Sequence, residues 1–165
     1  MLNLIKTRRS IRKFTSEAID DGQINQIIEA GTWAPSGLNN QPWKIAIIKD
    51  RNKKTSLAPL TRYSPIVEGA PVLIAVFMDI RLSYDRTKDV QAIGAFIQNM
   101  LLAIHALGLG GVWLGEILKN KDDVSNLLDA PDDLELMAVI ALGHPAEEGV
   151  SRSRKGLEEV VFLKD

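Results

Sequence analysis

The sequence predicts an α+β fold in which a central mixed sheet of four or five strands lies between two layers of helices. Two continuous apolar runs, over residues 71–78 and 134–142, are typical of strands buried on both faces. The segment 89–107 has a helical pattern that is apolar nearly all round, as expected for a central, buried helix. Because helices and strands alternate irregularly, with no repeat and no linker, we expect one three-layer α-β-α domain over residues 1–165.

The first third of the chain is predicted to contain two helices followed by a loop. Residues 3–8 favour a short helix. The second helix begins at an N-cap, Asp20 or Asp21, and keeps its isoleucines at helical spacing. Residues 34–42 are predicted to form a loop, because two prolines, a glycine, a serine and two asparagines fall within nine residues.

The middle of the chain leads from this loop to the long central helix. Residues 43–48 favour a strand, residues 51–57 favour a short helix, and residues 61–69 are expected to be irregular. After the first buried strand, the central helix is expected to end at the glycine-rich turn 108–111, because glycine commonly terminates helices.

The C-terminal third supplies the remaining elements. A short strand is predicted over 112–114, a helix over 121–128 and the second buried strand after it. Residues 157–163 are expected to add one more strand or an extended arm.

The composition excludes several classes of site. The chain has no cysteine, which excludes disulfides, thiolate metal ligands, iron–sulfur ligation and cysteine nucleophiles. Its two histidines, His105 and His144, are too few for a histidine-based metal site, and no Ser-His-Asp set or H-E-x-x-H motif is present. We interpret His105 as a hydrogen-bonded interior or interface residue and His144 as a turn residue. The sequence therefore predicts no metal site and no catalytic side chain.

The charge and hydropathy of the chain bound its location and partners. The net charge of −1 gives no general attraction to nucleic acid or to an anionic membrane. No uncharged apolar stretch is long enough to span a membrane, and the N-terminus lacks the apolar region of a secretory signal. A cytoplasmic location, with no nucleic-acid or membrane partner, is therefore the expectation.

Positive charge gathers near the two ends of the chain. Residues 1–14 carry two lysines and three arginines without any acid, and residues 151–155 carry two arginines and a lysine. Guanidinium groups offer forked donors to an oxyanion, and the hydroxyl of Ser10 fits between such oxygens. The two clusters either converge on one anion or form solvated basic ends, and charge patterning alone leaves both readings open.

Two further stretches suit a flat heterocyclic ligand. The amides of Asn39, Asn40 and Gln41 both donate and accept, as the edge of a flavin or purine requires. The glycines of segment 108–116 permit close backbone approach to a planar ring. The alternatives are a polar surface loop for the first stretch and a helix end followed by a core strand for the second. The second is not a G-x-G-x-x-G fingerprint, because it follows a helix and enters a strand.

Four stretches taken in order resemble the nitroreductase-like flavoprotein family. They are RRSIRKF near the N-terminus, APSGLNNQPW, QNMLLAIHALGLGGVWLGE and, near the end, RKGLEEVV, and together they span nearly the whole chain. The resemblance implies the nitroreductase-like fold and an interlocked homodimer with one FMN in each of two interface sites. It also implies an FMN-dependent NAD(P)H oxidoreductase that transfers hydride through flavin N5 to nitroaromatic or quinone-type acceptors by a ping-pong mechanism.

The resemblance assigns the basic clusters to the phosphate end and the pyrimidine edge of the FMN. Arg8, Arg9 and Ser10 would hold its phosphate or ribityl chain, and Arg12 would lie toward the pyrimidine edge of the ring. Arg152 and Arg154, near the C-terminus, would bind the same phosphate.

The resemblance assigns the other two stretches to the ring. From the partner subunit, the flavin would be reached by Pro35, Ser36, Gly37, Asn39 and Gln41. The residues that run along the ring and offer backbone groups near N5 would be Trp113, Leu114, Gly115 and Glu116, with the Glu116 side chain a candidate pocket residue. Because the cofactor carries the chemistry, no side chain needs to act as acid or base. The alternative function is an FMN-binding storage or redox-partner protein without turnover.

Overall fold

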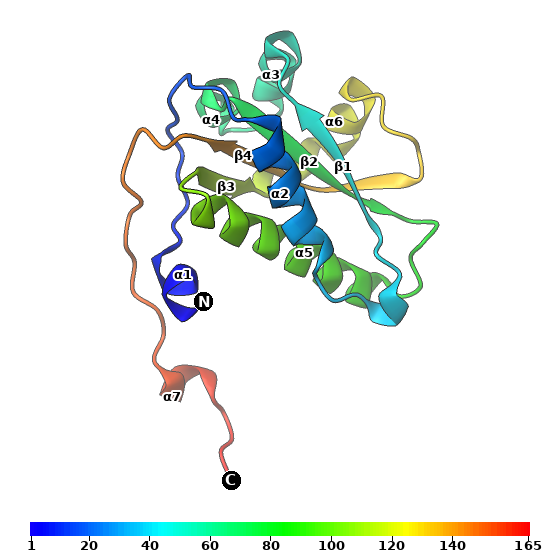
Figure 1. Ribbon diagram of the computed structural model, residues 1–165. Coiled ribbons are helices and arrows are strands. Elements are labelled where there is room, and N and C mark those ends of the chain that lie inside the picture. Colours follow the sequence, from blue (N-terminus) through cyan, green and yellow to red (C-terminus); the bar gives the residue numbers. More distant parts are fainter.

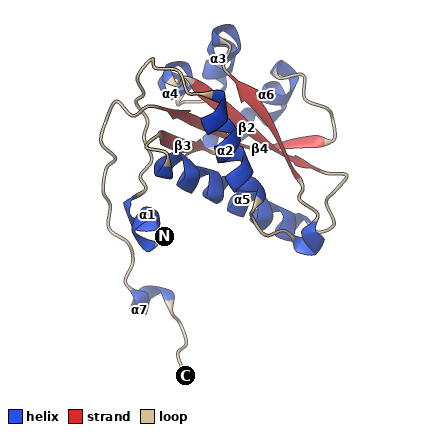
Figure 2. Cartoon of the chain, in the orientation of Figure 1, coloured by secondary structure: helices blue, strands red, loops and turns tan.

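The computed structural model describes all 165 residues, and its centre is a four-stranded sheet with the order β1-β2-β4-β3. The strands are β1 (Trp43–Ile48), β2 (Val72–Asp79), β3 (Gly110–Leu114) and β4 (Leu134–Gly143). Helices cover both faces of the sheet, as Figures 1 and 2 show. The predicted three-layer arrangement is therefore confirmed.

Alternation of side chains along β2 divides the core into two halves. Val72, Ile74 and Val76 point to one face, where they pack against α2 (Asp21–Thr32) and α5 (Arg86–Ala106). Leu73 and its alternate neighbours point to the other face, which is covered by α3 (Arg51–Leu57), α4 (Ser64–Gly69) and α6 (Lys121–Leu127). Every residue of β2 is buried, as its continuous apolar run predicts.

The predicted mixed sheet is wrong, because all neighbouring strands pair antiparallel. β2 and β3 do run parallel and are joined by the crossover helix α5, but β4 lies between them and pairs with both. Local sequence patterns cannot reveal such an insertion. The only parallel contact is the isolated bridge between Ser10 and Gly111.

One local prediction needs correction, and one open alternative is decided. Residues 61–69 are not wholly irregular: α4 forms over Ser64–Gly69 with Pro65 in its first turn, where the missing N–H costs nothing. Of the two alternatives predicted for residues 157–163, an additional strand or an extended arm, the structure has the arm. It carries the short helix α7 (Leu157–Val160) and extends away from the body (Figure 1).

The helix caps follow the sequence closely. The Asp20 carboxylate accepts hydrogen bonds from the N–H groups of Gly22 and Gln23 and so begins α2, as predicted. α5 begins three residues earlier than expected, because Asp85 is its N-cap and accepts from the Lys88 N–H at 3.0 Å.

The short helix α1 (Leu2–Thr7) is joined to the far end of α5 by a hydrogen bond between Thr7 and His105. None of the helices has the length and apolar character that crossing a membrane requires.

Substituting alanine at Gly31 is expected to destabilise the fold by roughly 1–3 kcal/mol, the usual cost of overpacking a core. A Cβ at this position of α2 would lie 2.8 Å from atoms of both Met100 and Phe96 on α5. Urea unfolding of the variant measures the loss. Gly69→Ala is the matched control, since nothing lies within 4 Å of its added Cβ; equal losses at both positions would contradict the packing argument.

Candidate cofactor site

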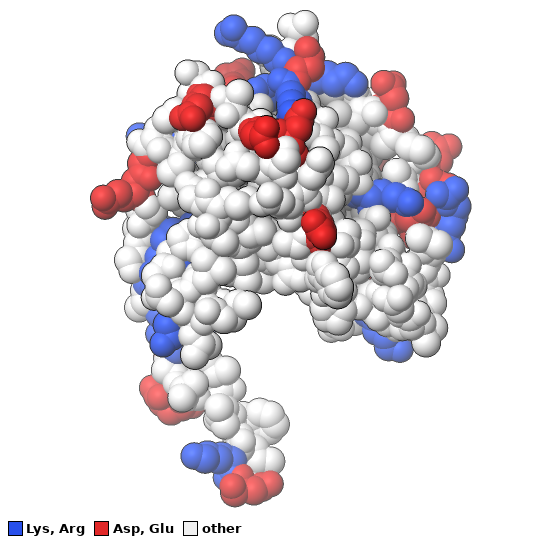
Figure 3. All heavy atoms as spheres, viewed as in Figure 1, with Lys and Arg blue, Asp and Glu red and all other residues white.

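Five arginines from the two ends of the chain converge on one cleft. The cleft, called here the arginine cleft, encloses about 220 Å³ and is lined by Arg8, Arg9, Ser10, Arg12, Val150, Arg152 and Arg154. The structure therefore brings together every residue that the resemblance assigned to the phosphate end, and adds Arg12 and Val150. Figure 3 shows basic side chains along the junction of the arm and the body.

Backbone contacts hold the two ends of the chain side by side. The N–H of Ile11 donates to the carbonyl of Gly111 at 3.1 Å, which fixes the N-terminal segment beside β3. The N–H of Ala146 donates to the carbonyl of Lys13 at 2.9 Å, and the N–H of Arg12 donates to the Glu147 carboxylate at 2.8 Å. These contacts place residues 8–12 opposite the start of the arm, which is why clusters distant in sequence meet.

The positive charge of the arginine cleft has no internal counter-ion. No carboxylate lines the cleft, and the ion pairs of the protein all involve other residues. Burial, followed by the charges of Arg154 and Arg9, lowers the pKa of Arg8. Like charges held together in this way favour an anionic ligand, and a phosphate monoester, which carries nearly two negative charges at neutral pH, would satisfy them.

The strand β3 borders the arginine cleft with an open edge. Because the Gly111 carbonyl points to this outer edge, alternation along the strand also directs the N–H and C=O of Trp113 outward. Trp113 is 42% exposed, whereas Leu114 is buried in the core. The backbone groups of Trp113 are thus available to a ligand. The side chain of Leu114 is buried and cannot contact one.

The Glu116 side chain is engaged within the protein. It accepts hydrogen bonds from the Thr61 hydroxyl at 2.7 Å and from the Arg62 N–H at 3.1 Å, and it forms an ion pair with Lys119. Lys119 above all, and then the Thr61 hydroxyl, lower the pKa of Glu116 from 4.5 to about 2 against the opposing effect of burial. These contacts join η3 (Glu116–Asn120) to the segment before α4. The Glu116 side chain therefore stabilises the backbone next to Gly115.

The stability that Glu116 provides is expected to disappear in acid. The contribution is fully present above the ordinary pKa of 4.5 and is lost as pH falls toward about 2, because the protonated group no longer forms its ion pair. The free energies of unfolding of the wild type and of Glu116→Gln, measured with urea, should therefore differ at pH 6 and converge between pH 4 and 2. At pH 6 the free energy of unfolding of Thr61→Val should differ from that of the wild type by a smaller amount. A gap that stays constant with pH would contradict the assignment.

The loop of residues 34–42 lines a second cleft of about 320 Å³. This loop cleft is lined by Pro35, Ser36, Gly37, Tyr84, Lys88, Gln91, Ala92 and Ala95. The predicted residues Asn39 and Gln41 lie on the exposed side of the same loop. Sequence reasoning did not assign Tyr84, Lys88 and Gln91 to a site, although Lys88, Gln91 and Ala95 share one helix face and their spacing could have linked them.

In one chain, the segments whose residues line the two clefts lie at opposite ends of α5 (Figure 1). The loop cleft is at Gln91, and α1, which precedes the arginine cleft, is joined to His105. A rise of 1.5 Å per residue over these fourteen positions separates the two ends by about 20 Å. In a single chain the loop residues and the arginines therefore line separate clefts.

Comparison with known proteins places this geometry in a family. The family model described as "Nitroreductase family" matches residues 5–64 and 58–144. The NADPH-flavin oxidoreductase of Vibrio harveyi is 34% identical over 176 residues, which cover 98% of this chain and 73% of that protein.

Solved structures agree in fold over the whole chain. A putative nitroreductase from Desulfovibrio desulfuricans in complex with FMN has a TM-score of 0.95 and 49% identity, with 99% of this chain and 96% of that chain covered. The NADPH:FMN oxidoreductase of Vibrio harveyi in complex with NAD⁺ has a TM-score of 0.90 and 28% identity, with 99% and 76% covered. The resemblance predicted from the four sequence stretches is confirmed: the chain belongs to the nitroreductase family.

Proposed function

We propose that the protein is an FMN-dependent NAD(P)H oxidoreductase that reduces nitroaromatic or quinone-type acceptors. The observation that carries the proposal is the arginine cleft, in which five guanidinium groups meet without a carboxylate. The relative from Desulfovibrio desulfuricans, solved with FMN, shares 49% of its sequence with this chain. Both observations support FMN as the anion that the cleft accepts.

The residues of the chain fit the parts of FMN in order. Arg8, Arg9 and Ser10, with Arg152 and Arg154 from the arm, would bind the phosphate as charge-assisted donors. Arg12 would place positive charge near the pyrimidine edge, and the outward N–H at Trp113 would orient the ring. When bound, FMN supplies the hydride-transfer chemistry, so the protein contributes position, charge and access.

The separation of the two clefts supports a homodimer. Because the residues of the loop cleft and of the arginine cleft lie at opposite ends of α5 in one chain, we infer that the loop contacts a flavin held by a second copy. Figure 3 shows the arm standing off the body, with a recess of mostly uncharged surface between them. A two-fold arrangement would fill this recess and build two equivalent sites, each with Pro35, Ser36, Gly37, Asn39 and Gln41 supplied by the partner.

Visible absorption spectroscopy tests the proposal. The protein is supplied with excess FMN, desalted and then mixed anaerobically with NADH or NADPH. Retained flavin peaks that bleach with the nucleotide are the expected result. Retained peaks that never bleach would favour flavin binding without turnover, and no retained flavin would overturn the cofactor assignment.

Steady-state kinetics tests the ping-pong part. If NAD(P)H and the acceptor use one flavin face in turn, initial-rate lines at several acceptor concentrations are expected to be parallel. Intersecting lines would show that both substrates bind together and would overturn the single shared site.

A further inference from the structure

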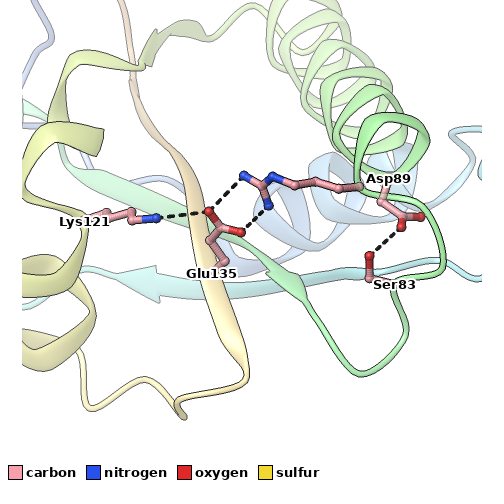
Figure 4. Close-up of polar contacts among 5 residues, drawn as sticks. Ser83, Asp89, Lys121 and Glu135 are labelled. Atoms are coloured by element: carbon pink, nitrogen blue, oxygen red, sulfur yellow. Dashed lines mark hydrogen bonds and ion pairs between the residues drawn. The ribbon is translucent and has the colours of Figure 1, made fainter.

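Asp89 is a buried carboxylate that connects two loops at the start of α5. Its side chain is 0% exposed. One carboxylate oxygen accepts from the Asn40 amide at 2.7 Å. The other accepts from the Ser83 hydroxyl at 2.7 Å and from the N–H groups of Tyr84 and Asp85 at 3.0 and 3.1 Å. Figure 4 shows Ser83 reaching Asp89 from the loop that precedes the helix.

The charge on Asp89 is stabilised by hydrogen bonds rather than by a cation. Burial alone would raise its pKa, but the hydrogen bonds outweigh burial and hold the pKa below its usual value. A buried carboxylate that forms no ion pair is uncommon in proteins, and such groups are retained where a precise shape is required.

The loop that Asp89 contacts has a strained backbone. Leu38, Asn39 and Gln41 have positive φ values of 54°, 55° and 46°, a region that non-glycine residues rarely adopt. Asn40 lies between them, and its amide donates to Asp89 and to the Leu82 carbonyl at 3.0 Å. A conformation of this kind persists only where surrounding contacts determine it, and Asn40 is the side chain that ties the loop to the helix.

We propose that Asp89 is a positioning residue that holds the loop of residues 36–41 in the strained shape needed to contact the flavin ring. The inference rests on the proposed function, in which this loop reaches the ring and the arginine cleft binds the phosphate. One carboxylate oxygen of Asp89 accepts from Asn40, and the other accepts from residues 83–85. The Asn40 contact can therefore be removed while the contacts to residues 83–85 are kept.

The variant Asp89→Asn makes this separation. The amide oxygen can still accept from Ser83, Tyr84 and Asp85, but the amide nitrogen then faces the Asn40 amide, so two donors meet. We expect the affinities for riboflavin and for FMN to fall by the same factor, about tenfold, because both ligands have the same ring. Fluorescence titration with each flavin measures the two dissociation constants.

A second substitution keeps the test independent of folding defects. Asn40→Ala removes the hydrogen bonds of Asn40 to Asp89 and to the Leu82 carbonyl, and it leaves the other three hydrogen bonds of Asp89 in place. A fall of at least the same size is expected in both affinities, and adding Asp89→Asn to Asn40→Ala should cause no further loss, because the Asn40–Asp89 interaction is already absent.

Glu135→Gln is the matched control at the same end of α5. It weakens the contacts of Glu135 with Arg86, at 2.5 and 3.1 Å, and with Lys121, at 3.2 Å (Figure 4), without touching the loop. We expect it to lower the melting temperature while flavin affinity stays unchanged. If Asp89→Asn and Asn40→Ala behave like this control, the positioning role is overturned. A wild-type protein that binds neither flavin would overturn the proposed function as well.

Discussion

Arg8→Ala and Arg154→Ala are each expected to weaken FMN binding by roughly 1.5–3 kcal/mol, or about ten- to 150-fold, the scale of a lost charged hydrogen bond. Both side chains line a cleft in which no carboxylate offsets their charge. The loss should come from the phosphate alone. Riboflavin, which has no phosphate, should therefore bind both variants as well as it binds the wild type.

Titration calorimetry with FMN and with riboflavin gives the required pair of dissociation constants. Arg51→Ala is the control, because this exposed arginine on α3 lies outside both clefts. Unchanged FMN affinity in both cleft variants would contradict the phosphate assignment. Equal losses for FMN and riboflavin would indicate that the arginines act on the ring or on the fold.

Deleting residues 156–165 is expected to weaken the proposed dimer by about 4 kcal/mol or more while leaving the arginines of the arginine cleft in place. Leu157 and Phe162 are 81% and 99% exposed in the single chain, and Val160 and Leu163 are also exposed. Fully burying an apolar side chain of this size contributes about 1.5–3 kcal/mol, so a partner that covers these residues gains several such contributions. Sedimentation equilibrium at several protein concentrations measures the change.

Smaller substitutions show whether the arm acts through its apolar side chains. Phe162→Ala should weaken the dimer by part of the full effect, and Lys164→Ala should leave it unchanged. A truncated protein that remains dimeric and retains its flavin would show that the arm lies outside the interface.

Local patterns predicted most of the elements because their causes are local. The Asp20 cap and the continuous apolar run of β2 each depend on a few adjacent residues, and both were predicted correctly. The order of the strands depends on which segments meet in space. The antiparallel sheet and the position of β4 therefore escaped a reading of the sequence, as did the six-residue helix α4.

The candidate site was predictable where composition marks it. Clustered arginines are conspicuous in a sequence, and the structure places Arg8 and Arg154 in one cleft. Asp89 was read as the start of the helix, whereas Asp85 is the N-cap and Asp89 is buried in the first turn. A carboxylate at a helix start is ordinarily a surface residue, so nothing local distinguishes the one that connects two loops.

The position of β4 has a consequence for the order in which the chain can fold. β2 and β3 are complete by residue 114, yet they flank a gap that only residues 134–143 can fill. A nascent chain that has emerged as far as α6 therefore exposes two unpaired strand edges, which can pair with other chains. The sheet closes only when its last-synthesised strand enters the middle, so folding should be cooperative, late in synthesis and sensitive to any delay before β4 emerges.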